Sequence, residues 1–108
     1  MRWADYAITA VRYSEDRAHI TNLEVRVDQD STLGGPDELT REAVVRMIEQ
    51  GYTFVTAYVR NGQWSRGAEV SVVPIGRDKY LRTDRNQVRA DNLGELPELA
   101  ARAAASWR

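Results

Sequence analysis

Arginines interleave with aromatic residues in the second half of the chain, and this pattern is the best candidate for a binding surface. The interleaved residues are Tyr58, Arg60, Trp64, Arg66, Tyr80 and Arg82. Aromatic rings beside cationic groups bind nucleotides and single strands by stacking and charge. The predicted ligand-binding set is Arg12, Tyr58, Arg60, Trp64, Arg82 and Thr83. A structural explanation is favoured, in which Tyr58 and Trp64 are cross-strand partners of one hairpin and the arginines are solvated.

A second polar group lies in the segment from Lys79 to Pro97. Asp91 and Asn92 can order a turn by hydrogen bonding to nearby backbone. Arg82 can pair with Asp91 through both guanidinium nitrogens and form a structural clasp of Arg82, Asp91 and Asn92. Alternatively, Arg82 presents its guanidinium to a bound anion and Thr83 adds a hydroxyl. The clasp is the favoured interpretation.

No pattern in the sequence predicts catalysis, a metal or a cofactor. The chain has no cysteine and a single histidine, His19, which no sequence pattern links to a serine or an aspartate. The stretch Asp28-x-Asp30-x-Thr32 begins like a calcium loop, but Leu33 and Leu39 occupy positions that require Gly and Glu. We therefore predict no catalytic residue, no metal ligand and no cofactor.

Charge is unevenly distributed along the chain, although the net charge is only −1. Residues 28–50 hold six acids and two arginines, a net of −4, whereas residues 60–89 hold seven bases and three acids, a net of +4. A basic half can orient an encounter with an anionic partner. Chance asymmetry, neutralised across the fold, is the favoured explanation, so we expect weak nucleic-acid binding at most.

The residues that could do chemistry must be positioned by strands and helices, and the first half of the chain predicts three of these. Tyr6–Tyr13 is rich in β-formers, and residues 19–28 alternate in polarity, so together they predict a hairpin. The stretch from Gln29 to Leu39 contains Gly-Gly-Pro and predicts a loop. A helix is expected to begin after Thr40 as N-cap and to end at Gly51.

The second half predicts strands and a final helix. Residues 52–60 and 63–73 are expected to pair across Asn61-Gly62, a strong signal for a hairpin turn, with a disturbance near Gly67. A short strand is predicted at 79–83. Pro97 can open a C-terminal helix, 97–107, that packs back through Leu99 and Trp107.

These elements together predict an α+β fold in ββαβββα order, with an antiparallel sheet and helices packed on one face. The length of 108 residues suits a single domain, 1–108, with its core at 5–97. The N-terminus lacks the apolar run of a signal peptide, and no segment is long enough to span a membrane. We expect a cytoplasmic protein without membrane partners.

Several short motifs resemble one bacterial family, domain of unknown function 3892. They are Ala10-Val11-Arg12, Gly51, Leu81-Arg82-Thr83, Asp91-Asn92-Leu93-Gly94 and Leu96-Pro97. The resemblance spans roughly Asp5 to Pro97, and neither the acidic loop 29–39 nor the Ala-rich segment after Pro97 follows the pattern. It implies a small, stand-alone bacterial protein with a single compact domain in the cytoplasm, and it supplies no mechanism.

Three classes of function are left open. The leading hypothesis is a non-enzymatic binding or interaction module that uses the Arg/Tyr face of the second hairpin and the last strand, with an unknown protein or a small anionic ligand as partner. The alternative is a nucleic-acid or nucleotide binder that uses the same Arg/Tyr-rich hairpin, and the third is an enzyme of unknown type. The oligomeric state does not follow from the sequence.

Overall fold

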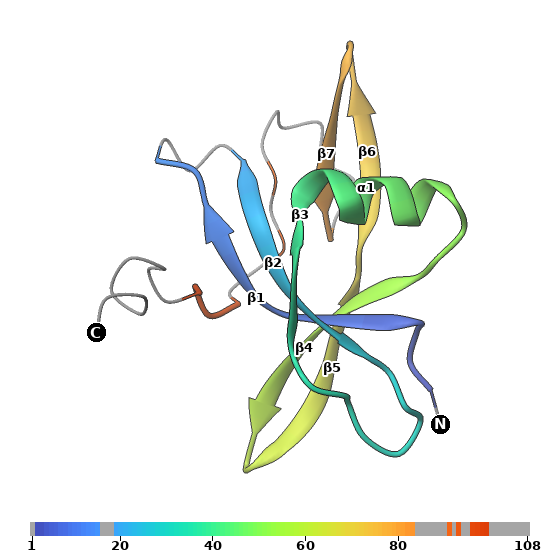
Figure 1. Cartoon of the computed structure of the whole chain (residues 1–108), viewed down its shortest axis with the longest axis vertical. Helices are drawn as coiled ribbons and strands as arrows, with labels where there is room; N and C mark the ends of the chain where they lie inside the picture. The colour runs from blue at the N-terminus through green and yellow to red at the C-terminus, as the bar shows by residue number, and fades with distance from the viewer. Residues whose placement is uncertain (1, 16–18, 84–90, 92, 94–95, 100–108) are drawn as a thin grey trace.

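Seven strands and one helix form in the described part of the chain, which is residues 2–15, 19–83, 91, 93 and 96–99 of the computed structural model (Figure 1). The elements are β1 Tyr6–Tyr13, β2 Ile20–Val27, β3 Asp37–Thr40, α1 Arg41–Glu49, β4 Phe54–Arg60, β5 Gln63–Glu69, β6 Ser71–Ile75 and β7 Asp78–Arg82. Five strands make one sheet in the order β3-β2-β1-β4-β5, and β6 and β7 make a second. The α+β class is confirmed.

The large sheet is mixed rather than antiparallel as predicted. Strands β1 and β2 form the expected antiparallel hairpin, but β1 pairs with β4 in parallel, from Tyr6 opposite Phe54 to Ile8 opposite Thr56. Parallel neighbours require a crossover connection. The segment between β2 and β4, which includes β3 and α1, supplies this connection, and its length made the parallel pairing possible.

The helix α1 follows the predicted local signals. The hydroxyl of Thr40 accepts a hydrogen bond from the Ala43 N–H at 3.2 Å, and Gly51 follows the C-cap with a φ of +104°. Val44 and Val45 are its buried residues, and α1 contacts β2, β3 and β6. The helix therefore covers one face of the large sheet and reaches the second sheet.

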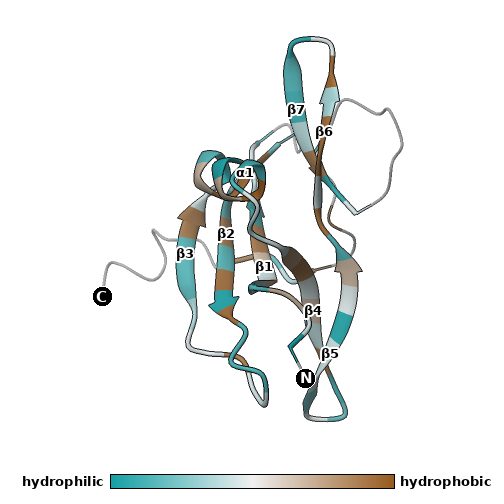
Figure 2. Ribbon diagram, turned by 90° about the vertical axis from the view of Figure 1, so that its right-hand side faces the viewer, coloured by the Kyte–Doolittle hydropathy of each residue, from teal (hydrophilic) through white to brown (hydrophobic). Residues whose placement is uncertain are grey.

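Hydrophobic residues gather on both faces of the large sheet, so β1 is buried along most of its length. The larger cluster lies under α1 and includes Ile8, Leu23, Val44, Phe54 and Leu81. Hydrophobic residues recur along β2, β4 and β6, which contribute to this core (Figure 2). The opposite face carries a smaller cluster, Ala4, Ala7, Val55 and Ala57, over which Trp3, Leu33 and Trp64 pack.

Two predictions about the middle of the chain were wrong in detail. The predicted loop 29–39 ends in an edge strand, β3, because Asp37–Thr40 pairs with β2 despite its acidic composition. The predicted strand 63–73 divides at the buried Val70 into β5, which pairs with β4, and β6, which pairs with β7. As a result the hairpins β4–β5 and β6–β7 point in opposite directions (Figure 1).

The predicted C-terminal helix does not begin at Pro97. The Val11 N–H donates to the Pro97 carbonyl at 3.0 Å, and the Leu99 N–H donates to the Val11 carbonyl at 2.8 Å. Beyond Ile8 the edge of β1 has no β4 partner, and its buried backbone groups need hydrogen bonds. Glu98 therefore forms a parallel bridge with Val11. Residues 100–108, including Trp107, lie outside the described residues.

Candidate functional site

The predicted Arg/Tyr surface is divided between the two faces of the β4–β5 hairpin. The turn forms as predicted, with positive φ at Asn61 and Gly62. Trp64 lies opposite Val59, and Tyr58 lies opposite Ser65. Directly opposite residues share a face of a sheet, so Tyr58 and Trp64 lie on different faces. They are not cross-strand partners, and Trp64 cannot join Tyr58 and Arg60 in one stacking surface.

The other predicted site residues lie on different strands. Arg12 on β1 pairs with Glu38 on β3, with 3.0 Å between Nη1 and Oε2. Arg82 at the end of β7 is 3% exposed and makes interactions of its own, and Thr83 follows it with partial exposure. Arg60 lies at the end of β4, in the hairpin that points away from β6–β7 (Figure 1). The structure therefore does not bring the predicted set together.

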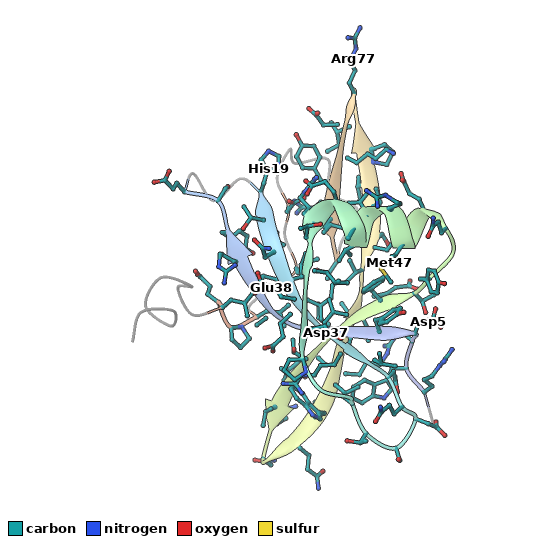
Figure 3. The ribbon with its side chains drawn as sticks, viewed as in Figure 1. Asp5, His19, Asp37, Glu38, Met47 and Arg77 are labelled. Carbon is teal, nitrogen blue, oxygen red and sulfur yellow. The ribbon has the colours of Figure 1, made fainter. Side chains whose placement is uncertain are left out.

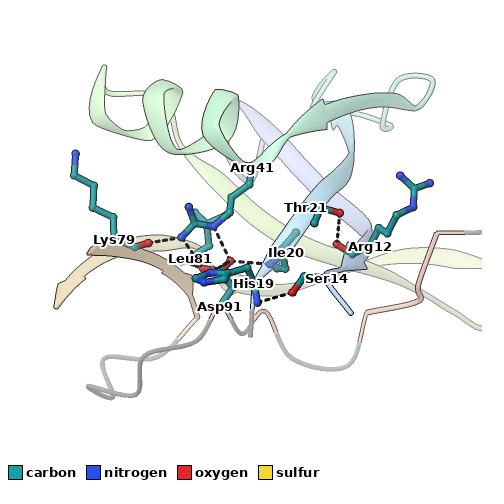
Figure 4. Close-up of polar contacts among 9 residues, drawn as sticks. All are labelled: Arg12, Ser14, His19, Ile20, Thr21, Arg41, Lys79, Leu81 and Asp91. Atoms are coloured by element: carbon teal, nitrogen blue, oxygen red, sulfur yellow. Dashed lines mark hydrogen bonds and ion pairs between the residues drawn. The ribbon is translucent and has the colours of Figure 1, made fainter. Parts of the chain in front are cut away.

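The buried carboxylate of Asp91 is held by Arg41 rather than by Arg82 (Figure 4). Arg41 donates from Nε to Oδ2 at 2.6 Å and from Nη2 to Oδ1 at 3.1 Å. These hydrogen bonds raise the pKa of the Arg41 guanidinium above its ordinary value. The backbone N–H groups of Ile20 and Leu81 each donate to Asp91 at 2.8 Å.

The predicted Arg82–Asp91 clasp is corrected for a geometric reason. Asp91 lies where the backbone N–H of Leu81 points, in the plane of the β7 edge, whereas side chains on a strand stand roughly perpendicular to the sheet. Arg41, at the start of α1, approaches from the side and also donates to the Lys79 carbonyl. Asn92, the third member of the predicted clasp, lies outside the described residues.

The Asp91 cluster is a structural connection between β2, α1 and β7. Four hydrogen bonds already occupy the two carboxylate oxygens, which leaves no open acceptor position for a substrate. His19 stacks on Tyr80 with ring centroids 5.7 Å apart, and its Nδ1 lies 3.7 Å from Asp91 Oδ2, beyond hydrogen-bond distance. His19 is thus placed beside the cluster without completing a proton-transfer pair.

A hollow of about 340 Å³ next to this cluster is the nearest match to the predicted anion site. Its basic lining residues are His19, Arg41, Arg46, Arg77 and Lys79, and its acidic ones are Glu42, Glu49 and Asp78. Arg41 is bound to Asp91, and Lys79 is paired with Glu49. Arg77 lies at the tip of the β6–β7 hairpin and its side chain points away from the molecule (Figure 3). The cations of this hollow therefore do not converge on one point.

A different cavity, of about 360 Å³, brings together two tryptophans that are far apart in the sequence. It lies between the N-terminal segment, the loop that follows β2 and the β4–β5 turn. Its lining residues are Trp3, Asp28, Asp30, Ser31, Thr32, Leu33, Gly62, Gln63 and Trp64. We call it the tryptophan pocket. Its volume is in the range typical of small-molecule sites, about 300–1,000 Å³.

The buried carboxylate of Asp28 fixes two walls of the tryptophan pocket. Its Oδ2 accepts hydrogen bonds from the backbone N–H groups of Trp3 at 2.7 Å and Ala4 at 3.3 Å. Its Oδ1 accepts from the Asp30 N–H at 2.9 Å, which orders the loop as an Asx turn. Asp28 was considered above as a metal ligand and rejected, and its role in the structure is to join the N-terminal segment to the loop.

The third wall, Trp64, is in contact with Arg26. The Arg26 guanidinium lies over the Trp64 ring, 5.0 Å from its centroid, and donates from Nη1 to the Gly34 carbonyl at 3.0 Å. Arg26 also reaches Thr9, whose hydroxyl donates to Glu24 at 2.7 Å. This network orients the indole before any ligand arrives, so the pocket needs little rearrangement to bind.

The smaller hydrophobic cluster explains why both indoles lie against this face. The small side chains of Ala4, Ala7 and Ala57 form most of the cluster beneath them. No described helix covers this face, since α1 lies on the other. Trp3 and Trp64 are partly exposed, and both pack against this cluster and line the cavity.

Sequence reasoning included Trp64 but missed Trp3, Ser31, Thr32 and Gln63. The only local signal was the Asp28-x-Asp30 spacing, which marks an Asx turn. Among the described residues, no group of three or more His, Asp or Glu side chains is placed to hold a metal ion. The described α1 is too short and too polar to cross a membrane.

Comparison with known proteins gives one match. A model of the family described as "Protein of unknown function (DUF3892)" matches residues 7–97. The chain belongs to this family. The resemblance found in the sequence motifs is thereby confirmed, and the match covers most of both sheets and all of α1. No curated protein and no solved structure matches the chain.

Proposed function

We propose that this member of the family is a small non-enzymatic binding module, and that its ligand site is the tryptophan pocket. The observation that carries the proposal is the convergence of Trp3 and Trp64 on one cavity of about 360 Å³. Partly exposed aromatic rings bind ligands with large contact area and little loss of conformational freedom. The leading hypothesis from the sequence is retained, but its site moves from the Tyr58/Arg60 face to the opposite face of the same hairpin.

Two features support a binding role for this pocket. The three walls are fixed by contacts that do not involve the ligand, through the hydrogen bonds of Asp28 for two of them and through the guanidinium of Arg26 for Trp64. The polar side chains of Ser31 and Thr32 at the rim are exposed and make no hydrogen bond among the residues that the structure describes. Apolar surface surrounded by a few available polar groups is the usual composition of a small-molecule site.

The nucleic-acid alternative gains less support. Arg60 adjoins the β4–β5 turn, and Arg77 lies at the tip of the β6–β7 hairpin, and these hairpins point in opposite directions (Figures 1 and 3). Phosphate binding depends on basic groups that follow one continuous path. Arg41 and Lys79 are already paired with carboxylates.

The proposal is tested by screening a fragment library of neutral, cationic and anionic compounds by thermal shift. Hits are then measured against Trp64→Phe and Ser31→Ala, with Tyr58→Ala as the matched control, because Tyr58 is an exposed aromatic residue on the other face of the same hairpin. We expect at least a five-fold weaker Kd for the pocket variants and no change for the control. Hits that are lost only with Tyr58→Ala would contradict the proposal.

A further inference from the structure

A groove of about 480 Å³ runs between the outer edge of β6 and the end of α1. Its lining includes Ile48, Tyr52, Thr53, Val72 and Pro74. We propose that this groove binds a short, extended peptide segment of another protein, which adds to β6 as a strand and places an apolar side chain against α1. The groove shares no lining residue with the tryptophan pocket, so the inference goes beyond the proposed function.

The backbone of β6 directs hydrogen-bonding groups into this groove. The Leu81 N–H and the Lys79 carbonyl form hydrogen bonds with side chains outside the second sheet, so the backbone groups of both residues point away from β6. In an antiparallel pair, the residues opposite such positions point outward as well. Those residues are Val72 and Pro74. The edge therefore presents the N–H and C=O of Val72 and the C=O of Pro74.

These edge groups are unpaired in the part of the chain that the structure describes. There β7 is the only strand that pairs with β6, and no hydrogen bond joins the backbone of Val72 to a residue outside β7. Val72 is half-buried, and its side chain packs against the core under α1. Backbone groups that are removed from water need hydrogen-bond partners. An extended backbone in the groove would supply them.

The groove continues the line of β4, so a strand has room beside this edge. The Val70 N–H donates to the Phe54 carbonyl of β4 at 2.9 Å. Val72 lies two positions further along, and in an extended chain its N–H points to the same side as that of Val70. β4 begins at Phe54, whereas β6 extends beyond that point (Figure 2). A bound segment would occupy the place beside β6 that β4 leaves, which is the recognition mode of strand addition.

The residue that binds opposite Val72 is expected to carry an apolar side chain. Directly opposite residues share a face of a sheet. The side chains of Val72 and Ile48 both pack against the core under α1, so the side chain opposite Val72 would lie on the same face. Tyr52 is 45% exposed and adds aromatic surface to the groove. Burial of apolar surface there would add to the backbone hydrogen bonds.

A second copy of this chain fits the edge less well than a short peptide. The strand β6 has five residues, and Pro74 cannot donate a hydrogen bond from its edge. A proline on an edge strand opposes continuous pairing with the sheet of another molecule. A peptide needs only the three groups that Val72 and Pro74 present.

The test begins with a phage library of random seven-residue peptides that is selected on the folded, full-length protein. Synthetic copies of the selected peptides are measured by fluorescence anisotropy against Val72→Pro and Tyr52→Ala. Val72→Pro removes the edge N–H, which does not bond to β7, so the β6–β7 pairing is kept. We expect each variant to weaken the Kd at least five-fold. Tyr58→Ala removes another exposed tyrosine, on the hairpin that points away, and should leave binding unchanged.

N-methylated peptides test the backbone contact without any change to the protein. Methylation should weaken binding at least ten-fold at the positions whose N–H faces β6, and much less at the alternate positions, whose N–H faces away. The bound peptide should also slow hydrogen exchange of the Val72 amide at least ten-fold. The Val73 amide faces β7 and should change much less.

Peptides that bind Val72→Pro as tightly as the parent and show no alternation under N-methylation would overturn the inference, as would a library that yields no binder. Binding that is lost with Trp64→Phe and kept with Val72→Pro would also overturn it, while supporting the proposed function of the tryptophan pocket. Dimerisation in sedimentation experiments that is lost with Val72→Pro would overturn the peptide as occupant in favour of a second copy.

Discussion

The Asp91 carboxylate shows how one residue can connect three elements. Its side chain is fully buried, and it accepts hydrogen bonds from the start of β2, from β7 and from the first residue of α1 (Figure 4). A buried ion pair is a weak source of net stability, but the removal of one partner leaves a desolvated charge. Removal of the partner of Asp91 is therefore expected to lower the stability of the fold.

We predict that Arg41→Ala lowers the free energy of unfolding by about 3 kcal/mol or more, because it leaves the Asp91 carboxylate without its cation. Chemical denaturation of Arg41→Ala, Asp91→Ala and the double variant gives the coupling energy. Arg46→Ala, an exposed arginine on the same helix, is the control and should change stability by less than about 0.5 kcal/mol. Additive effects of the two variants would show that the pair is not coupled.

Gly67 is required by close approach of the strands rather than by its φ angle. A Cβ at this position would overlap the Thr56 hydroxyl, which accepts a hydrogen bond from the Ala68 N–H at 2.9 Å. The register between β4 and β5 shifts at this point, between Val55 and Ala57. The disturbance predicted near Gly67 is therefore confirmed, and its cause is this side chain inserted against the backbone of β5.

We predict that Gly67→Ala destabilises the protein by about 1–3 kcal/mol through overpacking against Thr56. In a Thr56→Ala background the same change should cost less, because the overlapping hydroxyl is gone. Gly35→Ala is the control, since a Cβ there meets no atom within 4 Å. Equal costs in the two backgrounds, measured by urea denaturation, would contradict this explanation.

At the scale of elements, the sequence correctly predicted the features that depend on only one or two neighbouring residues. Thr40 caps α1, Gly51 follows its end, and Asn61-Gly62 forms the turn, because each depends on the φ angle or side chain of one or two residues. The parallel pairing of β1 with β4 and the strand β3 depend on partners distant in the chain. Nothing in the sequence next to these strands specifies which edge they join.

The candidate site was missed for the same reason. Trp3 and Trp64 share a pocket only because Asp28 binds the Trp3 N–H across 25 positions and Arg26 lies over Trp64. The sequence placed Trp64 in the correct hairpin, but the register decides its face. A one-residue difference in pairing would have placed it beside Tyr58.

The parallel pair β1–β4 begins at an exposed link between Asp5 and Thr53. The Asp5 carboxylate accepts hydrogen bonds from the Thr53 N–H at 2.8 Å and the Thr53 hydroxyl at 3.0 Å. These bonds, with the nearby Arg2, lower the pKa of Asp5 below its ordinary value of 3.8. A carboxyl group with a lowered folded-state pKa stabilises the fold above its ordinary pKa and loses that contribution as pH falls through the folded-state value.

We predict that Asp5→Asn is less stable than the parent at pH 7, and that the difference shrinks as the pH is lowered below 3.8. Thermal denaturation of both proteins between pH 2 and pH 7 measures it. Asp30→Asn is a control without the Thr53 contacts. A difference that does not depend on pH would show that the charge of Asp5 does not contribute through these hydrogen bonds.

At the scale of the whole molecule, the two hairpins extend in opposite directions and carry the exposed arginines apart (Figure 1). The net charge is −1, and Arg60 and Arg77 belong to different hairpins. We predict that single-stranded and duplex oligonucleotides bind with a Kd of about 10 µM or weaker at physiological salt. Fluorescence anisotropy at two salt concentrations measures this. Submicromolar binding that persists at high salt and is lost with Arg60→Ala would restore the nucleic-acid alternative.

The most direct test of the central claim is the response of the indole N–H signals in a ¹H–¹⁵N NMR titration with a ligand obtained from the fragment screen. The chain has three tryptophans, which single Trp→Phe variants assign. The tryptophan pocket predicts that the indole signals of Trp3 and Trp64 shift together and fit one Kd. Shifts of the Tyr58 and Arg60 backbone signals, with both of these indoles unmoved, would contradict it.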